Sequence, residues 1–72
     1  MASDKSHSQH VIRSLRGGWD VKKTGASRAS KHFENREEAI EWARSIARNQ
    51  QSELYVHGED GRVQSKESYQ KQ

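Results

Sequence analysis

Hydrophobic positions in the middle of the chain recur at intervals of three and four residues, the spacing that gives a helix one broad apolar face. Asn35 precedes this stretch and is a good N-cap, because its side-chain oxygen can accept hydrogen bonds from the amides of the first turn. Glu38, three residues later, suits a capping box. The pattern predicts a helix from Asn35 to Asn49. Its apolar positions are Ala39, Ile40, Trp42, Ala43, Ile46 and Ala47.

Short runs of alternating apolar and polar residues predict strands on both sides of this helix. Gly17-Gly18 before the helix and Asp60-Gly61 after it are hairpin-turn signals, since both turns need a residue that tolerates positive φ. The element order is therefore β-β-(β)-α-β-β, with the third strand the shortest. The predicted strands are His10–Leu15, Trp19–Thr24, Lys31–Glu34, Ser52–His57 and Arg62–Lys66.

This order predicts an α+β fold of two layers, in which an antiparallel sheet of four to five short strands packs against one helix. In the first strand two registers are open: either Val11 and Leu15, or Ile12, faces the core. We expect residues 1–9 to be a disordered lead-in, 10–66 to form a single domain and 67–72 to be a polar tail. The expected core side chains are Val11, Ile12, Leu15, Trp19, Val21, Phe33, Ile40, Trp42, Ile46, Leu54, Val56 and Val63.

The core must be small, because only 29% of the 72 residues are hydrophobic. A core of this size supplies about 3–5 kcal/mol of net stability, which suits a marginal monomer or an oligomer. Cysteine is absent, which excludes disulfides and thiolate metal ligands. Without a signal peptide or an apolar run of about 20 residues, we expect a soluble cytoplasmic protein that does not enter a membrane.

Charge is unevenly distributed along the chain. Residues 10–31 hold six bases against one acid, whereas residues 32–72 hold six bases against eight acids. A basic segment of this kind suits a nucleic acid or another polyanion, because each Lys or Arg contact with a phosphate releases a counterion. The same split also suits self-association of unlike faces, or solubility alone. The six bases are Arg13, Arg16, Lys22, Lys23, Arg28 and Lys31.

No catalytic or cofactor motif occurs in the chain. The four histidines lack the paired spacing of a zinc site, and no Walker loop, G-x-G-x-x-G or G-x-S-x-G sequence is present. His57-Gly58-Glu59 matches the H-x-E fragment of the zinc deaminases, but the required P-C-x-x-C ligand pair is missing. We therefore expect no enzymatic activity, no catalytic residue, no cofactor and no metal.

Two side chains of the strand after the helix, Tyr55 and His57, should point away from the helix by alternation. They would then lie on an open sheet face, which is a second candidate for an interaction surface. The main expectation is a small non-enzymatic module that binds nucleic acid or a polyanion weakly through the basic front half. The alternative is a protein-interaction or self-associating module, such as a homodimer, that uses the open face or an edge strand.

A set of landmarks distributed from His10 to Tyr69 resembles the bacterial family known as domain of unknown function 2188. The resemblance implies a short folded protein with no assigned activity, cofactor or partner. The landmarks are His10-Val11, Trp19-x-Val21, Gly25-Ala26-Ser27-Arg28-Ala29, Phe33, Glu38-Ala39-Ile40, Ala43-Arg44, Glu53-Leu54, His57-Gly58, Asp60-Gly61-Arg62 and Ser68-Tyr69.

Overall fold

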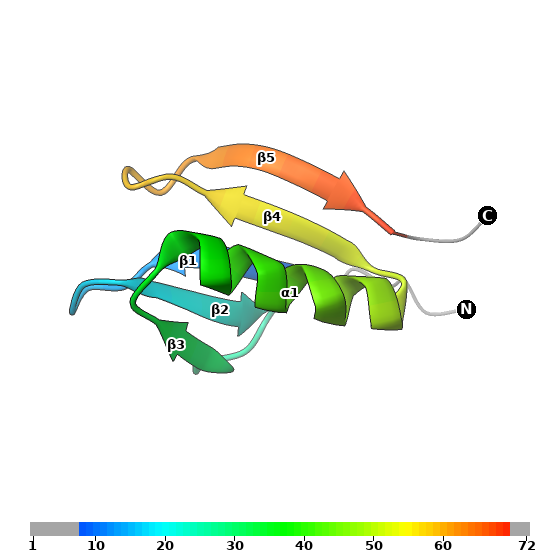
Figure 1. Ribbon diagram of the computed structural model, residues 1–72, viewed down its shortest axis with the longest axis horizontal. Helices are drawn as coiled ribbons and strands as arrows, with labels where there is room; N and C mark the ends of the chain where they lie inside the picture. The colour runs from blue at the N-terminus through cyan, green and yellow to red at the C-terminus, as the bar shows by residue number, and fades with distance from the viewer. Residues whose placement is uncertain (1–7, 70–72) are drawn as a thin grey trace.

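The computed structural model describes residues 8–69, which form one helix and a five-stranded sheet in the order β-β-β-α-β-β (Figure 1). This confirms the predicted α+β fold class. Of the expected lead-in of residues 1–9, residues 1–7 lie outside the described part of the chain, whereas Gln9 is buried and already belongs to the first strand. The elements are β1 (Gln9–Arg13), β2 (Trp19–Lys23), β3 (Lys31–Phe33), α1 (Arg36–Gln50), β4 (Glu53–His57) and β5 (Val63–Ser68).

The helix begins and ends within one residue of the predicted positions. The Asn35 side chain accepts hydrogen bonds from the Glu37 and Glu38 amides at 2.8 and 3.4 Å, so it is the N-cap. Within residues 8–69 no bond returns from the Glu38 carboxylate, so the cap is a simple asparagine cap and the capping-box prediction is wrong. Gln51 terminates the helix in the left-handed conformation, with φ of 53°.

The strand order across the sheet is β3-β2-β1-β4-β5. Three of the four neighbouring pairs are antiparallel as predicted, but β1 and β4 run parallel, so the sheet is mixed. The cause is the path of the chain: β3 and β4 point the same way, and α1 is the crossover that connects them. A helix is the usual means of joining parallel strands.

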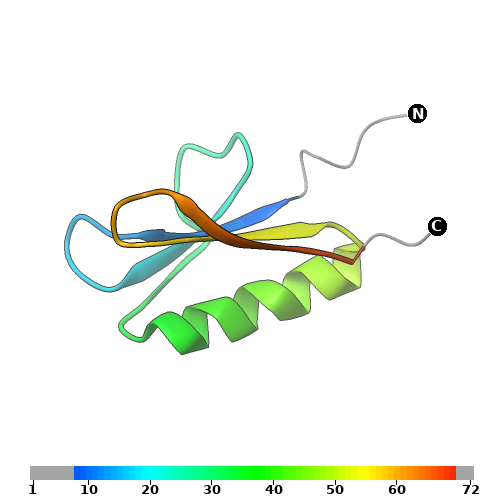
Figure 2. The same cartoon turned by 90° about the horizontal axis from the view of Figure 1, so that it is seen from above.

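The core lies between α1 and one face of the sheet (Figure 2). Three alanines one turn apart, Ala39, Ala43 and Ala47, are completely buried there. Their small side chains let the helix backbone approach the sheet closely. Phe33 and Trp42 are only half-buried and close the side of this layer near β3, with ring centroids 5.8 Å apart. The other buried apolar residues are Val11, Trp19, Val21, Leu54 and Val56.

Some expected core residues lie elsewhere. The register of β1 places Val11 inside and Ile12 half-buried on the opposite face. Leu15 is fully exposed, at 105%, because β1 ends at Arg13 and Leu15 belongs to the following turn. Val63 is 53% exposed, since an irregularity between Val56 and His57 pairs it with His57 on the face away from α1.

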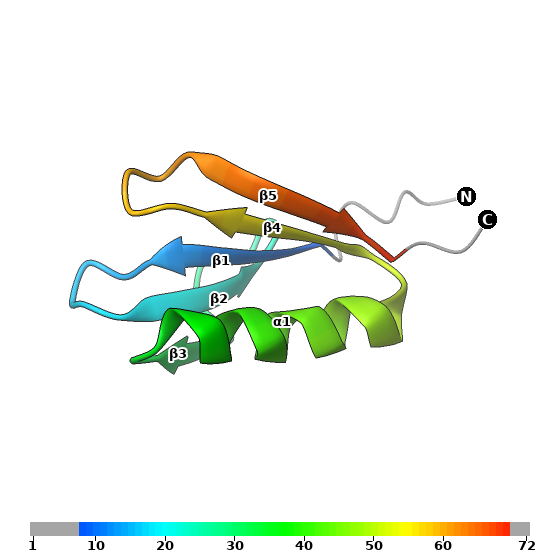
Figure 3. The ribbon, with the colours of Figure 1, turned by 45° about the horizontal axis from the view of Figure 1, so that its top comes forward.

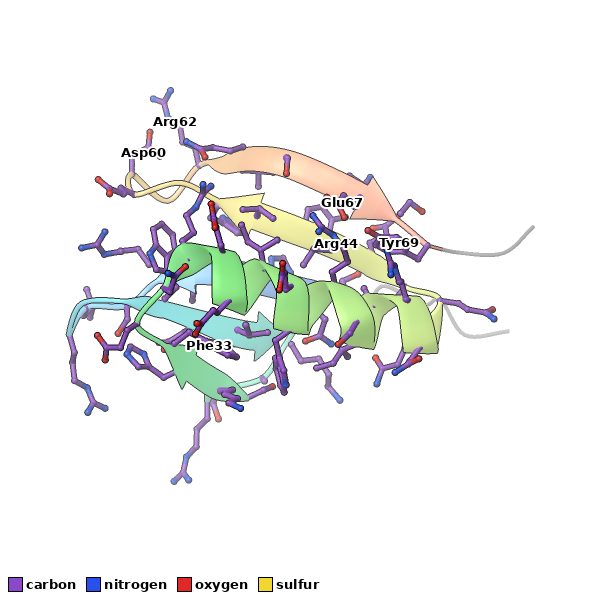
Figure 4. The ribbon with its side chains drawn as sticks, in the orientation of Figure 1. Phe33, Arg44, Asp60, Arg62, Glu67 and Tyr69 are labelled. Carbon is purple, nitrogen blue, oxygen red and sulfur yellow. The ribbon has the colours of Figure 1, made fainter. Side chains whose placement is uncertain are left out.

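The last strand is longer than predicted and is tied to the helix. β5 runs to Ser68, two residues beyond the expected end of the domain. Arg44 on α1 donates two hydrogen bonds to the Glu67 carboxylate, at 2.8 and 2.9 Å, and the Tyr69 hydroxyl donates to the same group (Figure 4). These bonds hold the pKa of Glu67 below its ordinary value, the Arg44 bonds being the larger cause.

Candidate functional site

The candidate site is the sheet face opposite α1, together with the loop of residues 24–30 that rises from it (Figure 2). On this open face the side chains come from alternate positions of the strands that also build the core. The turn between β1 and β2 and the turn between β4 and β5 lie at the same end of the sheet (Figure 3). Residues far apart in the sequence therefore meet on one surface.

Tyr55 points to the open face, as alternation predicts, but its ring is already covered. The cross-strand row His10, Tyr55, Lys66 places one neighbour on each side of it. The His10 ring stacks on it with centroids 4.9 Å apart and planes 12° apart, and the Lys66 ammonium lies 5.6 Å from the ring centroid. The Tyr55 hydroxyl donates to the Glu53 carboxylate at 2.5 Å, which raises the pKa of Tyr55. Neither face of the ring is free to stack on a nucleobase.

His57, which was predicted on the open face, forms a bridge between β4 and β1 with His10. His10 Nδ1 lies 3.1 Å from His57 Nε2, and His10 Nε2 lies 2.8 Å from Thr24 Oγ1. On the far side, His57 Nδ1 lies 3.0 Å from the Gly61 carbonyl oxygen. Burial and the neighbouring His57 lower the pKa of His10. This bridge connects the start of loop 24–30 to the β4–β5 turn.

The six predicted basic residues do not share one environment. Arg13 pairs with Glu59 at 3.3 Å and lies over the Trp19 ring, with its guanidinium 5.4 Å from the ring centroid. Lys31 lies over Phe33 on the side of the sheet that α1 covers, with its ammonium 5.2 Å from that ring centroid. Arg13 is therefore paired with an acid, whereas Lys31 makes ring contacts only and also lines the larger of the two clefts described next. The side chains of the other four bases make no hydrogen bond or ion pair within residues 8–69; these are Arg16, Lys22, Lys23 and Arg28.

These four bases border two clefts, and loop 24–30 contributes residues to both. The larger cleft, of about 620 Å³, is lined by Arg16 and Arg28 and by the Asp20–His32 pair, whose Oδ1 and Nδ1 atoms are 2.6 Å apart. The smaller cleft, of about 240 Å³, is lined by Lys22 and Lys23, by His10 and His57 and by the loop residues Thr24, Gly25 and Ala26. The larger cleft thus holds three bases, since Lys31 lines it as well, beside one Asp–His pair, and the smaller cleft holds two bases and two histidines.

The chain order explains which of these features the sequence analysis missed. The His10–His57 bridge joins residues 47 positions apart, and it needs the parallel β1–β4 pairing that the prediction lacked. Alternation along the strand identified one half of this bridge, because it placed His57 on the open face. The Asp20–His32 pair follows from the β2–β3 register, which aligns these two residues.

Within residues 8–69, no group of three or more His, Asp or Glu side chains is arranged to hold a metal ion. Over the same residues, α1 is too short and too polar to cross a bilayer. The arrangement offers cationic side chains and imidazoles beside shallow clefts. Side chains of these types can form charge-assisted hydrogen bonds with an anion.

Comparison with known proteins identifies a family but names no function. The family model described as "Uncharacterized protein conserved in bacteria (DUF2188)" matches residues 9–69. The "Uncharacterized protein YdaT" of Bacillus subtilis (strain 168) is 45% identical over 58 residues, which are 81% of this chain and 38% of that protein. The chain therefore spans well under half of this relative's length. No solved structure matches it.

Proposed function

The chain belongs to this family of uncharacterised bacterial proteins, and from that premise we propose that it is a small module that binds nucleic acid weakly through the phosphate backbone. Its open sheet face and loop 24–30 would form the contact surface. The name of the family assigns no ligand, so the proposal depends on the charge and geometry of this surface.

The observation that carries the proposal is the set of four bases around loop 24–30 that no acid neutralises within residues 8–69. In the same part of the chain Glu59, Asp60 and Glu67 are paired with Arg13, Arg62 and Arg44, away from the two clefts. Free cations around one loop of a small domain attract a polyanion and release its counterions on contact.

The same surface lacks an exposed aromatic side chain that could recognise individual bases. Stacking platforms need an exposed aromatic face, and the Tyr55 ring lies between His10 and Lys66. Contacts to phosphate position a protein on nucleic acid without reading its sequence. We therefore expect weak binding with little sequence preference and strong dependence on salt.

A fluorescence anisotropy titration with labelled single-stranded and duplex DNA tests the proposal. If all four bases contact phosphate, the affinity for duplex DNA should fall about a hundredfold between 50 and 200 mM salt. The variant Arg16→Glu/Arg28→Glu should lose most binding at low salt. The matched control is Arg48→Glu/Arg62→Glu, because both arginines are exposed and lie outside both clefts, and the change in net charge is the same. Absence of binding at low salt, or an equal loss in the control, would refute the proposal.

A second candidate function is self-association along β5, which is the longer of the two edge strands and carries the exposed Val63. Unpaired edges invite pairing with another strand. Sedimentation velocity over a range of concentrations should then show a dimer that Val63→Lys weakens. A single monomeric species at all concentrations rejects this candidate.

A further inference from the structure

The larger of the two clefts is bounded by three parts of the chain that meet beside β2. Arg16 comes from the β1–β2 turn, Arg28 from loop 24–30 and Lys31 from β3 (Figure 2). These three bases face one carboxylate, that of Asp20, so the lining carries a net charge of +2 with His32 neutral. A concave surface of this sign attracts an anion, and attracts a doubly charged anion most strongly.

The two arginines of the cleft are the side chains that can bind an anion directly. Both residues are exposed, and neither guanidinium makes a hydrogen bond or ion pair within residues 8–69. A guanidinium can donate two parallel hydrogen bonds to one phosphate group. Lys31 contributes its charge over a longer distance, because its ammonium lies over the Phe33 and Trp42 rings.

Backbone hydrogen bonds hold the two segments that carry these arginines. The β1–β2 turn is closed by a bond from the Ser14 amide to the Gly18 carbonyl oxygen at 3.0 Å. At the far end of loop 24–30, the Ser30 amide donates to the Val21 carbonyl oxygen at 2.6 Å. Ser14 Oγ, which also lines the cleft, accepts from the Arg16 amide at 3.2 Å and keeps its own hydrogen available to a ligand. Binding therefore needs to order only side chains, which keeps its entropic cost low.

The carboxylate in the cleft affects which phosphate can bind there. Asp20 Oδ1 lies 2.6 Å from His32 Nδ1, and the Asp20 side chain is 24% exposed, so its negative charge remains in the lining. A phosphodiester within a strand carries one charge and is flanked by nucleotides on both sides. A phosphate at the end of a strand carries a charge of about −1.5 to −2 at pH 7, has three strong acceptor oxygens and is flanked on one side only. The terminal group therefore matches both the charge of the cleft and its concave shape.

We propose that this cleft binds the terminal phosphate of a nucleic-acid strand, which is a phosphomonoester, in preference to the internal phosphodiesters. This inference rests on the proposed function and adds recognition of strand ends to it. Arg16 and Arg28 would bind the phosphate oxygens from the two sides of the cleft, and Ser14 would donate a further hydrogen bond.

Anisotropy titrations test the inference with one short single-stranded DNA, labelled internally, that carries either phosphate or hydroxyl groups at both ends. At pH 8 the terminal phosphates are doubly charged. Wild type should bind the phosphate-ended DNA about two- to fivefold more tightly at low salt, which is the effect of one additional exposed ionic contact. Equal affinities for the two DNAs would overturn the inference.

Two double variants separate the cleft from the general effect of charge. Arg16→Gln/Arg28→Gln and Lys22→Gln/Lys23→Gln each remove two positive charges, but only the first pair lines the larger cleft. The first variant should lose the preference for phosphate ends. The second should bind both DNAs more weakly and keep the preference. Equal loss of the preference in the two variants would show that the whole surface attracts the extra charge, and would overturn the inference.

A titration with inorganic phosphate at constant ionic strength, followed in backbone amide spectra, distinguishes failure of this inference from failure of the proposed function. DNA binding without a preference for phosphate ends overturns the inference alone. Absence of DNA binding overturns the proposed function and, with it, the strand end as the source of the phosphate. Saturable shifts of the Arg16 and Arg28 amides would then assign the cleft to small phosphomonoesters, whereas absence of shifts would overturn the phosphate site itself.

Discussion

Enlarging the central alanine of the helix tests how closely α1 packs on the sheet. Ala43 is completely buried between Ala39 and Ala47, in the layer that faces Val11 and Leu54. Ala43→Leu adds three carbon atoms to this filled layer, and overpacking of this kind costs about 1–3 kcal/mol of unfolding free energy. A domain of this size has only about 3–5 kcal/mol in total. The variant should therefore lose between a fifth and nearly all of its stability.

Urea unfolding followed by tryptophan fluorescence measures this loss, because Trp19 is 6% exposed and reports on the core. With a denaturant slope of about 1 kcal/mol per molar urea, the midpoint should fall by about 1–3 M. The matched control is Glu41→Leu, which adds the same side chain to an exposed position of the same helix and should change the midpoint little. An unchanged midpoint for Ala43→Leu would show that the helix does not pack closely on the sheet.

Three further predictions concern the C-terminal ion pair, the histidine bridge and the first turn. Glu67→Gln should lower stability by about 0.5–1 kcal/mol at pH 7, since a bidentate but partly exposed pair with Arg44 is lost. Because the pKa of Glu67 is lowered from 4.5, this difference should be full above pH 4.5 and shrink as the pH falls below it, which acid unfolding curves will show. The pKa of His10 is lowered from 6.5, so the unfolded chain binds more protons and stability should fall as the pH drops below 6.5. Thermal melts of His10→Gln should be less sensitive to pH over that range, and equal sensitivity would contradict the assignment. Gly18→Ala should cost more stability than Gly17→Ala: both have positive φ, but a β-carbon at Gly18 would lie 2.5 Å from a carbonyl oxygen of β3, whereas none lies near Gly17. Chemical unfolding of the two variants gives the comparison, and equal losses would contradict it.

Local features of the fold were readable in the sequence because each depends on neighbouring residues. The Asn35 cap, the three-and-four spacing of α1 and the glycine turn after β1 specify their own backbone geometry. Errors appeared where a strand ended early. Leu15 was expected in the core, but it lies past the end of β1 and is fully exposed.

The candidate site was only partly predictable for a related reason. Local alternation placed Tyr55 and His57 on the open face, and composition identified the basic front half. Whether a base is free depends on its three-dimensional neighbours. Arg13 is neutralised by Glu59, which is 46 positions away in the chain, and Lys31 lies over aromatic rings beside α1.

The amino-acid sequence by itself determined the helix, the two hairpins and the excess of bases in the first half, because these follow from short-range propensity and composition. Only the tertiary structure decided that β4 lies parallel to β1. That pairing depends on how α1 crosses the sheet, which no local pattern encodes. The same crossover brings His10 to His57 and leaves four bases unpaired around one loop within residues 8–69. The surface proposed to bind nucleic acid is thus a product of chain topology, since long-range packing selects which of the charges remain free.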